Sequence, residues 1–597
     1  MNRKFPIAAS KRHQFSWCAV LALTLSACGA DDTSSTAVQS SAIPRTIPTT
    51  PRTSPATATS APTTHPTTAA STPVPVGATD AARLLEQATF GVTASDIAHV
   101  QSIGIDAYIN EQLAYPPTQY TGYSYTPSAK PANCLGDGSY PLDAPSVCAR
   151  DLYSPFNVQR DFFTHALNNP DQLRQRVAFA LSQIMVVSSV DIIEAYGLAA
   201  YQNVLLKDAL GNYRTLLQDV TLSATMGRYL DMANNDKTNF QNGNVPNQNY
   251  AREVLQLFSI GLVELNPDGT PQLDANGTVL PTFDAATIAG FSSVFTGWTY
   301  PPLPGANSQW QNAVNLAGAM VAFPDHHEPG TKGLLNGYTI PASQTPAQDL
   351  SDALDNIFNH PNVGPFISQQ LIQHLVTSNP SPAYVARVAA IFANNGQGVR
   401  GDLSAVVRAI LTDSEARGAA PATNLFGHVR EPVLFITGIL RSFGGRSDGV
   451  FLRNSSAAMG ESLFSPDTVF SYFPPSYQIP GTQTLAPEME IDNAATALAR
   501  ANFIETLIMQ GGAAADPTLP HSTGTAIDLT SLATGNNNAA LIAQLNQTLL
   551  HGSLTDAASN IILTAAESVA AGSTDPLAAQ RTASYLILTS AQYQVER

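Results

Sequence analysis

Charged residues are scarce in this chain, and basic residues are the scarcest. Only 12% of the 597 residues are charged, and 29 Lys and Arg stand against 45 Asp and Glu, which gives a formal net charge of −16. The phosphates of DNA or RNA would be repelled, so the composition excludes a nucleic-acid partner. Hydrophobic residues make up 44% of the sequence, which is ample for the core of a globular protein.

No long hydrophobic run opens the chain. The apolar run from Trp17 to Leu25 follows four basic residues and is far shorter than the roughly 20 residues that a transmembrane helix needs. This layout is typical of a cleaved signal peptide rather than of a retained membrane span. We therefore expect residues 1–27 to be removed.

The next four-residue motif, Leu25-Ser26-Ala27-Cys28, resembles the lipobox of bacterial lipoproteins. The resemblance implies a diacylglycerol on the Cys28 thiol and a third acyl chain on its amino group, which suffices for stable anchoring. Gly29 stands where an Asp would resemble an inner-membrane retention signal. We expect an outer membrane lipoprotein that faces the periplasm or the cell surface, with the membrane as a partner. The alternative is an ordinary signal peptide cleaved nearby.

Residues 28–77 lack aromatic side chains and consist mainly of Ser, Thr, Pro and Ala. Such a segment cannot bury enough apolar surface to offset the entropy cost of ordering it. It predicts a disordered or polyproline II tether, after which a single helical body extends over residues 78–597.

Cysteine is also rare, because the chain has only four. Cys18 lies in the signal and Cys28 is the expected lipid attachment site, so Cys134 and Cys148 remain in the body. A pair in the cell envelope predicts a disulfide, worth about 3 kcal/mol for a loop of about 15 residues. No further Cys or His stands at zinc-ligand spacing from either thiol.

Several cofactor and metal motifs are missing from the chain. It has no Walker-type phosphate loop and no His-Glu-x-x-His helix, and we predict neither a cofactor nor a metal. Acid/base pairs such as those of glycosidases leave no local signature, so these absences do not exclude an enzyme.

Apolar spacing and capping residues predict a mainly α fold, with one large multi-helix domain. A short stripe of Ala and Leu ends at Gly91, after which Thr93 and Asp96 resemble a capping box. The other expected helix starts are Asn169-Pro170, Thr345-Pro346, Ser381-Pro382 and Asp402.

A small β-hairpin or meander is expected near residues 262–283. The turn sequences Asn266-Pro267-Asp268-Gly269 and Asn276-Gly277 separate three short apolar stretches there. Alternating oxygen-bearing residues echo a calcium loop, but Ala275 occupies its closing position, which disfavours calcium.

The body resembles one bacterial family, the one named domain of unknown function 1800, over residues 78–597. The segments that carry the resemblance are Ala82–Gly91, Leu173–Ala180, Asn249–Glu253, Phe295–Trp298, His327–Lys332 and Ser378–Pro382. Gln248 stands where the family more often has Glu, and Glu328 where it has Asp. The resemblance implies an architecture but no activity.

One set of candidate site residues is a polar row on the helix after Pro246. Asn249, Glu253 and Gln256 lie beside the apolar stripe at i, i+4 and i+7, and Arg252 lies one step round the helix. Glu253 could act as a general acid or base and Arg252 could hold an anionic group, with Asn249 and Gln256 binding. The alternative is that Arg252 and Glu253 form a structural tie between helices.

Two arginines add to this hypothesis. Arg176 leans toward the packed side of its helix and must find carboxylates or carbonyls there. We expect Glu253 to be an attractive partner for Arg176 and Arg174.

The second set of candidate residues is the loop Asp325-His326-His327-Glu328, followed by Lys332. Adjacent histidines between carboxylates can supply a general base, a proton donor or a metal ligand. A structural loop network is the alternative. His374, on an apolar helix face, is expected to be a core histidine.

Two functions from different classes remain. The first is an enzyme that acts on an extracellular or cell-wall polymer by acid/base chemistry, using Glu253, Arg252, His327, Glu328 and Lys332. The second is a non-catalytic binding or assembly lipoprotein with a polymer or protein partner. A cleft that brings Glu253 within hydrogen-bond reach of His327 or Glu328 would favour the first, and separate buried networks would favour the second.

Overall fold

The computed structural model describes residues 76–130, 134, 145–417, 425–519, 521–532 and 537–597, leaving out the side chains of 145–147. The expected signal peptide, the lipid attachment site Cys28 and most of the expected tether lie outside the described residues. The described part falls in one unit, from Thr72 to Arg597. None of its helices combines the length and the apolar character that crossing a bilayer requires.

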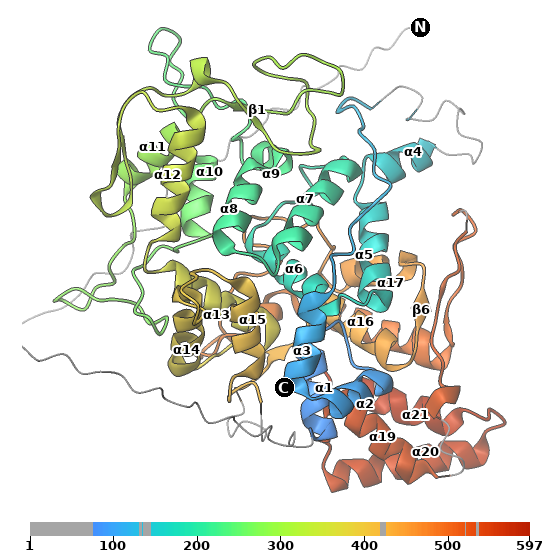
Figure 1. Cartoon of the computed structure of the whole chain (residues 1–597). Helices are drawn as coiled ribbons and strands as arrows, with labels where there is room; N and C mark the ends of the chain where they lie inside the picture. The colour runs from blue at the N-terminus through green and yellow to red at the C-terminus, as the bar shows by residue number, and fades with distance from the viewer. Residues whose placement is uncertain (1–75, 131–133, 135–144, 418–424, 520, 533–536) are drawn as a thin grey trace, which may run out of the picture. The chain divides into compact units, whose positions relative to one another are not determined.

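The described part of the chain is mainly α-helical, as the sequence predicts (Figure 1). Its first half contains α1 (Ala78–Ala88), α2 (Ala94–Ile103), α3 (Ile105–Ala114), α4 (Pro145–Leu152), α5 (Phe156–Asn168), α6 (Gln172–Ile184), α7 (Ala195–Asp208), α8 (Tyr213–Leu222), α9 (Ala224–Tyr229), α10 (Asn249–Gln256) and α11 (Ala285–Val294). Its second half contains α12 (Pro346–Phe358), α13 (Val363–Leu375), α14 (Pro382–Ala393), α15 (Leu403–Thr412), α16 (Pro432–Ser442), α17 (Val450–Ala458), α18 (Ala494–Ile504), α19 (Asn538–Leu550), α20 (Asp556–Gly572) and α21 (Ala578–Leu588).

Side-chain caps begin several helices where the sequence predicts them. Thr93 accepts a hydrogen bond from the backbone of Asp96 before α2, and Thr345 forms a full capping box before α12. Ser381 and Asp402 cap α14 and α15 in the same way.

Helix α6 departs slightly from the expected start. It begins at Gln172 after Asp171 rather than at Asn169-Pro170. The Asp171 carboxylate is engaged elsewhere, since it accepts hydrogen bonds from the backbone and the hydroxyl of Thr118 at 2.8 and 2.9 Å. It therefore ties α6 to the chain that follows α3.

One continuous hydrophobic core joins most of these helices. Helices α6 and α16 are buried along almost their whole length, including Arg176 and the glutamines of α6. The last helices, α19, α20 and α21, pack on one another beside α1 and α2 (Figure 1). Every charged group on α6 must therefore be satisfied inside the protein.

The meander near 262–283 is confirmed as three short extended stretches. Isolated antiparallel bridges pair Val263 with Pro281, Leu265 with Pro271 and Leu273 with Val279. Gly269 and Gly277 close the two turns with positive φ values of 80° and 81°, a conformation that favours glycine.

Short strands elsewhere form two- and three-stranded sheets within the described residues. The antiparallel pairs are β1 (Trp298–Thr299) with β2 (Val321–Ala322), β3 (Lys332–Gly333) with β4 (Thr339–Ile340), and β5 (His428–Val429) with β9 (Val595–Glu596). The three-stranded sheet has the order β6 (Arg446–Ser447), β8 (Thr525–Ala526), β7 (Gly512–Ala513). Short helical turns complete the list: η2 (Pro324–His326), η3 (Leu335–Gly337), η4 (Pro487–Ile491), η5 (Glu505–Met509) and η6 (Thr530–Leu532).

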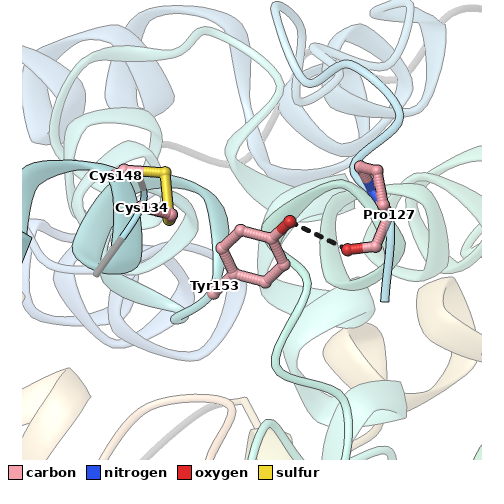
Figure 2. The surroundings of a disulfide bond; sticks show 4 residues. All are labelled: Pro127, Cys134, Cys148 and Tyr153. Atoms are coloured by element: carbon pink, nitrogen blue, oxygen red, sulfur yellow. Dashed lines mark hydrogen bonds between the residues drawn. A yellow bond between two sulfur atoms is a disulfide. The ribbon is translucent and has the colours of Figure 1, made fainter. Parts of the chain in front are cut away.

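The expected disulfide between Cys134 and Cys148 is confirmed. Both cysteines are buried, and their Cα atoms lie 5.1 Å apart. They form a small satellite cluster with Tyr153, whose hydroxyl donates to the carbonyl of Pro127 at 2.8 Å (Figure 2). The disulfide thus ties Cys134 to Cys148 on α4.

Candidate functional site

The polar row expected after Pro246 lies on α10, and its members have different surroundings. Arg252 is exposed, whereas Glu253 retains only 8% of its accessible surface. Asn249 Nδ2 donates to Asp231 Oδ2 at 3.3 Å. Gln256, the last residue of α10, lines a pocket. The row therefore does not form one surface. Among its members, Glu253 remains a candidate for chemistry and Gln256 a candidate for binding.

Glu253 has the properties of a proton donor. Burial raises the pKa of its carboxyl group, and Arg252 opposes this only in part. Its Oε2 atom has no hydrogen-bond partner among the described residues. A carboxyl group that keeps its proton to higher pH can serve as a general acid.

The His327 loop forms a buried network. His327 Nε2 donates to Asp349 Oδ2 at 2.9 Å, and Lys332 Nζ donates to the same oxygen at 2.7 Å. Lys332 Nζ also donates to the backbone carbonyls of Glu328 and Gly330 at 2.6 and 2.9 Å. All three donor positions of the ammonium group are satisfied, so the network ties the loop to α12.

The two constellations are not brought together. Glu328 Oε2 accepts from the backbone of Thr238 at 3.0 Å. No hydrogen bond or ion pair in the described part of the chain joins Glu253 to His327, Glu328 or Lys332. The described residues therefore do not bring Glu253 within hydrogen-bond reach of the His327 loop, although the enzyme hypothesis expects that contact.

The expected contact of Arg176 and Arg174 with Glu253 is not formed. Arg176 is fully buried and donates to the carbonyl of His374 at 2.6 Å. Arg174 donates to the carbonyl of Leu206 at 3.2 Å. The charges that act on the Arg176 side chain are instead those of four other glutamates. His374, which we expected to be a core histidine, is half-buried, and desolvation lowers its pKa to about 3.

Sequence reasoning missed those four glutamates. Together with Arg176 and His428 they form what we call the buried charge cluster: Arg176, His428, Glu431, Glu461, Glu488 and Glu596. His428 lies centrally, with Nδ1 3.6 Å from Glu488 Oε1 and Nε2 3.6 Å from Glu596 Oε2. The pairing of β5 with β9 places His428 directly opposite Glu596.

The remaining glutamates of the cluster lie at the start of α16. Glu461 Oε2 accepts from the backbone N–H of Val433, in the first turn of that helix, at 2.8 Å. Glu431 Oε2 accepts from Gln183 Nε2 at 2.8 Å. Both carboxyl groups thus lie where the positive end of the α16 dipole stabilises a negative charge.

Burial and crowding split the pKa values within the cluster. Burial raises the pKa of Glu461 well above its usual range, and the neighbouring Glu431 raises it further. Burial raises the pKa of Glu488 to about 7. Burial alone would lower the pKa of His428, but Glu596 and Glu488 together raise it to about 9. The cluster therefore holds protonated groups inside the core. Groups with shifted pKa values occur both at functional sites and in structural networks.

A weak sequence signal marks this cluster. His428, Arg430 and Glu431 fall within four residues of a chain in which only 12% of residues are charged, and Pro432 follows them. Their partners Glu488 and Glu596 are too distant in the sequence to be paired by any local rule. No group of three or more His, Cys, Asp or Glu in the described ranges is arranged to hold a metal ion.

A long irregular stretch of chain lies beside this cluster. It spans residues 459–493, and we call it the 459–493 segment. It joins α17 to α18 and contains η4 as its only helical turn. Gln159 Nε2 donates to the carbonyl of Leu463 at 2.5 Å, and the Asn379 side chain exchanges two hydrogen bonds with the backbone of Leu485 at 2.8 and 2.9 Å. An ordered loop of this length in a folded domain is usually functional.

Two pockets lie against the 459–493 segment and share Phe470, Pro474 and Ser476 in their walls. The smaller, of about 240 Å³, we call the amide pocket. The larger, of about 800 Å³, we call the hydroxyl pocket. Ser471, in the wall of the hydroxyl pocket, has a φ of 66°, a strained conformation for a residue with a side chain.

Three helices supply the polar walls of the amide pocket. Gln183 comes from the end of α6, Gln256 from the end of α10 and Gln370 from the middle of α13. Gln183 Oε1 and Gln370 Nε2 are buried and have no hydrogen-bond partner among the described residues. Phe366, one turn before Gln370, provides an apolar wall.

Two glycine patterns have the spacing of known motifs in the wrong structural context. Gly445 to Gly449 spells Gly-x-Ser-x-Gly, but Ser447 lies in β6 without a left-handed backbone, and its hydroxyl group bonds to Thr525 Oγ1 at 2.6 Å. Residues 396–401 spell Gly-x-Gly-x-x-Gly, but they follow α14 rather than a strand. Neither is a nucleophile elbow or a dinucleotide site.

The family model described as "Protein of unknown function (DUF1800)" matches residues 83–595. The chain belongs to the DUF1800 family. No curated protein and no solved structure matches it. Membership of DUF1800 confirms the resemblance seen in the sequence and assigns no activity.

Two segments that carry the DUF1800 resemblance pack on each other. Thr296 Oγ1 accepts from the backbone of Glu328 at 2.9 Å. Gly297 has a φ of 80°, and a Cβ atom there would lie only 3.0 Å from the backbone nitrogen of His327. These residues hold the His327 loop in place.

Proposed function

We propose that this DUF1800 protein is an outer membrane lipoprotein whose body binds an extracellular or cell-wall polymer in the amide pocket. The signal, the Cys28 lipobox and the Ser/Thr/Pro-rich tether support the anchoring. A tethered body can sample a volume around its attachment point, which suits capture of an immobile polymer.

The unpartnered amides of the amide pocket carry the proposal. Buried polar atoms are nearly always paired, so each orphan in a native structure needs an explanation. Gln183 Oε1 is an acceptor and Gln370 Nε2 is a donor, and both belong to the wall of the same pocket. Both atoms are shielded from solvent, so a ligand would satisfy them after the Gln183 and Gln370 side chains turn toward the pocket.

Support also comes from the way in which the pocket is built. Its amides stand on the rigid helices α6, α10 and α13, and the anchored 459–493 segment closes its far side. Polar groups on helices with an apolar remainder are typical of ligand pockets.

Binding to purified cell-wall material and to insoluble polysaccharides tests the proposal. We expect the mature chain to cosediment with at least one such polymer, and Phe470→Ala to weaken the binding. Phe470 lines both pockets with 43% of its surface exposed, so its loss should leave the fold intact. The matched control is Phe240→Ala, which removes a 93% exposed ring that is absent from both pocket walls. Binding that resists Phe470→Ala would refute the proposed site.

A second candidate is an acid/base enzyme, and one observation favours it. Glu253 combines a raised pKa with an unpartnered oxygen, and it precedes the pocket residue Gln256 by one helical turn. Glu253→Gln should then abolish release of soluble fragments from the bound polymer while the melting temperature and polymer binding stay unchanged. A large drop in melting temperature, with the same activity per folded molecule, would show Glu253 to be structural.

A further inference from the structure

The hydroxyl pocket contains two carboxylates that lack a counterion. Asp467 and Glu490 both line its wall, and both residues are exposed. Neither side chain forms an ion pair or a hydrogen bond with any residue in the described ranges. None of the described residues in the wall is Lys, Arg or His, so these two negative charges are uncompensated. The pocket therefore attracts a cation, and the net charge of −16 adds to that attraction.

A free hydroxyl group in the same wall indicates a place for a ligand atom. Ser471 keeps only 7% of its accessible surface, although most buried polar groups are hydrogen-bonded. Its hydroxyl group has no partner among the described residues, and the oxygen is not shielded from solvent. An ammonium group in the pocket can therefore donate to this oxygen without any rearrangement of the protein.

Aromatic and proline rings make up much of the remaining wall, namely Phe470, Tyr472, Phe473, Pro466 and Pro474. The face of an aromatic ring attracts a cation electrostatically, and the attraction grows when water is displaced. Rings beside carboxylates thus suit an ammonium group on a hydrocarbon stem. They do not suit a metal ion, and no group of three or more His, Cys, Asp or Glu in the described ranges is arranged to hold one.

The size of the hydroxyl pocket fits an organic molecule. Its volume of about 800 Å³ falls within the range of about 300–1,000 Å³ that is typical of small-molecule sites. A ligand with a single ammonium group would leave one of the two carboxylates without a partner. A ligand with at least two positive charges can compensate both.

We infer that the hydroxyl pocket binds a small oligoamine, an organic cation with two or more ammonium groups on an apolar stem. Asp467 and Glu490 pair with ammonium groups, Ser471 accepts a hydrogen bond from one of them, and the rings cover the stem. The site goes beyond the proposed function, because these three residues are absent from the wall of the amide pocket. A basic peptide offers the same charges, but its backbone N–H and C=O groups would lie unpaired against the rings.

Titration calorimetry on the full mature chain tests the inference with matched probes. Cadaverine and spermidine are the amines. The linear pentanediol has the carbon chain of cadaverine without its charge, glutarate has the opposite charge, and tetralysine is the peptide probe. We expect both amines to bind, and the diol and glutarate to bind at least tenfold more weakly. A tenfold rise in salt concentration should weaken the binding of the amines, because salt screens partly exposed charges.

Variants then locate the site. Asp467→Asn and Glu490→Gln should each weaken amine binding by about two- to fivefold, and the double variant by about tenfold, as expected for loss of partly exposed charge pairs. Ser471→Gly should weaken it by about two- to tenfold through one lost hydrogen bond. The fold should survive this change, because glycine tolerates the φ of 66° at this position.

A matched control lies on the same segment. Asp492→Asn makes the same chemical change as Asp467→Asn at an exposed position that is absent from the pocket wall, and it should bind the amines like wild type. Polymer binding in the amide pocket should be unchanged in Asp467→Asn. The two sites are therefore tested separately, and failure of one leaves the other standing.

Three results would overturn the inference. The first is equal binding of cadaverine and the diol, or no binding of either amine at millimolar concentrations. The second is amine binding that is unchanged in the double variant. The third is tetralysine binding that is tighter than that of both amines and is lost in the double variant, which would assign the pocket to a basic peptide instead.

Discussion

Replacing Asp349 by Asn should destabilise the protein by about 3–5 kcal/mol, the usual cost of removing one partner from a buried ion pair. Asp349 is fully buried on α12, and its Oδ2 accepts from both His327 and Lys332. The Lys332 side chain is only 1% exposed, so the change leaves an ammonium group in the core without its counterion.

A matched control lies on the same helix. Asp355 pairs with Arg214 at 2.6 Å, but its side chain is 55% exposed. Asp355→Asn makes the same chemical change in a solvated ion pair, for which we expect a cost of about 0–1 kcal/mol. The difference between the two variants isolates the effect of burial.

Urea unfolding followed by tryptophan fluorescence measures both variants. A double variant, Asp349→Asn with Lys332→Met, should recover part of the lost stability, because the unpaired charge is then removed as well. An Asp349→Asn variant as stable as Asp355→Asn would refute the claim that His327, Asp349 and Lys332 form a structural tie.

The stability that Asp349→Asn loses should also depend on pH. Burial alone would raise the pKa of Asp349, but the hydrogen bonds from His327 and Lys332 lower it below the usual value. A lowered pKa means that the stabilisation is present above the unfolded-state value of about 3.9 and is lost as the pH falls through the folded-state value. The gap between wild type and Asp349→Asn should therefore be full at pH 6 and shrink below about pH 4.

Other predictions concern the anchor, the disulfide and the buried charge cluster. Cys28→Ser should move the protein from the detergent phase to the aqueous phase in a partition assay, and unchanged partitioning would contradict lipidation. Cys148→Ser should lower the free energy of unfolding by about 3 kcal/mol in urea denaturation. Glu461→Gln should lower the free energy of unfolding by less than about 1 kcal/mol, because the raised pKa keeps Glu461 protonated. Glu596→Gln should lower it by about 3 kcal/mol, because the pKa of Glu596 is lowered. Equal losses in the two variants would contradict this assignment.

Local signals in the sequence predicted much of the fold. Thr93, Thr345, Ser381 and Asp402 act within three residues of the helix that each one starts, so their role can be read without knowing the tertiary structure. The meander was predictable for the same reason, since its turns are encoded by neighbouring residues.

The candidate site was predicted less well, because its partners are distant in the sequence. Helical spacing correctly placed Arg176 in the core, but it could not indicate that Glu431 and Glu596 rather than Glu253 supply the opposing charge. The amide pocket joins helices that begin at residues 172, 249 and 363, and sequence reasoning found only Gln256 among its amides. Periodicity assigns a residue to a face, whereas the neighbour of that face depends on topology.

The pairing of β5 with β9 has a consequence for how the protein is made. Residue 596 faces His428 in the core, and the backbone of Arg430 donates to the carbonyl of Gln594 at 2.9 Å. The helices from α1 to α21 can all have been synthesised while His428 still lacks Glu596, one of its two closest countercharges. A nascent chain that has not yet reached Glu596 therefore keeps this cluster open, which quality-control proteases can recognise.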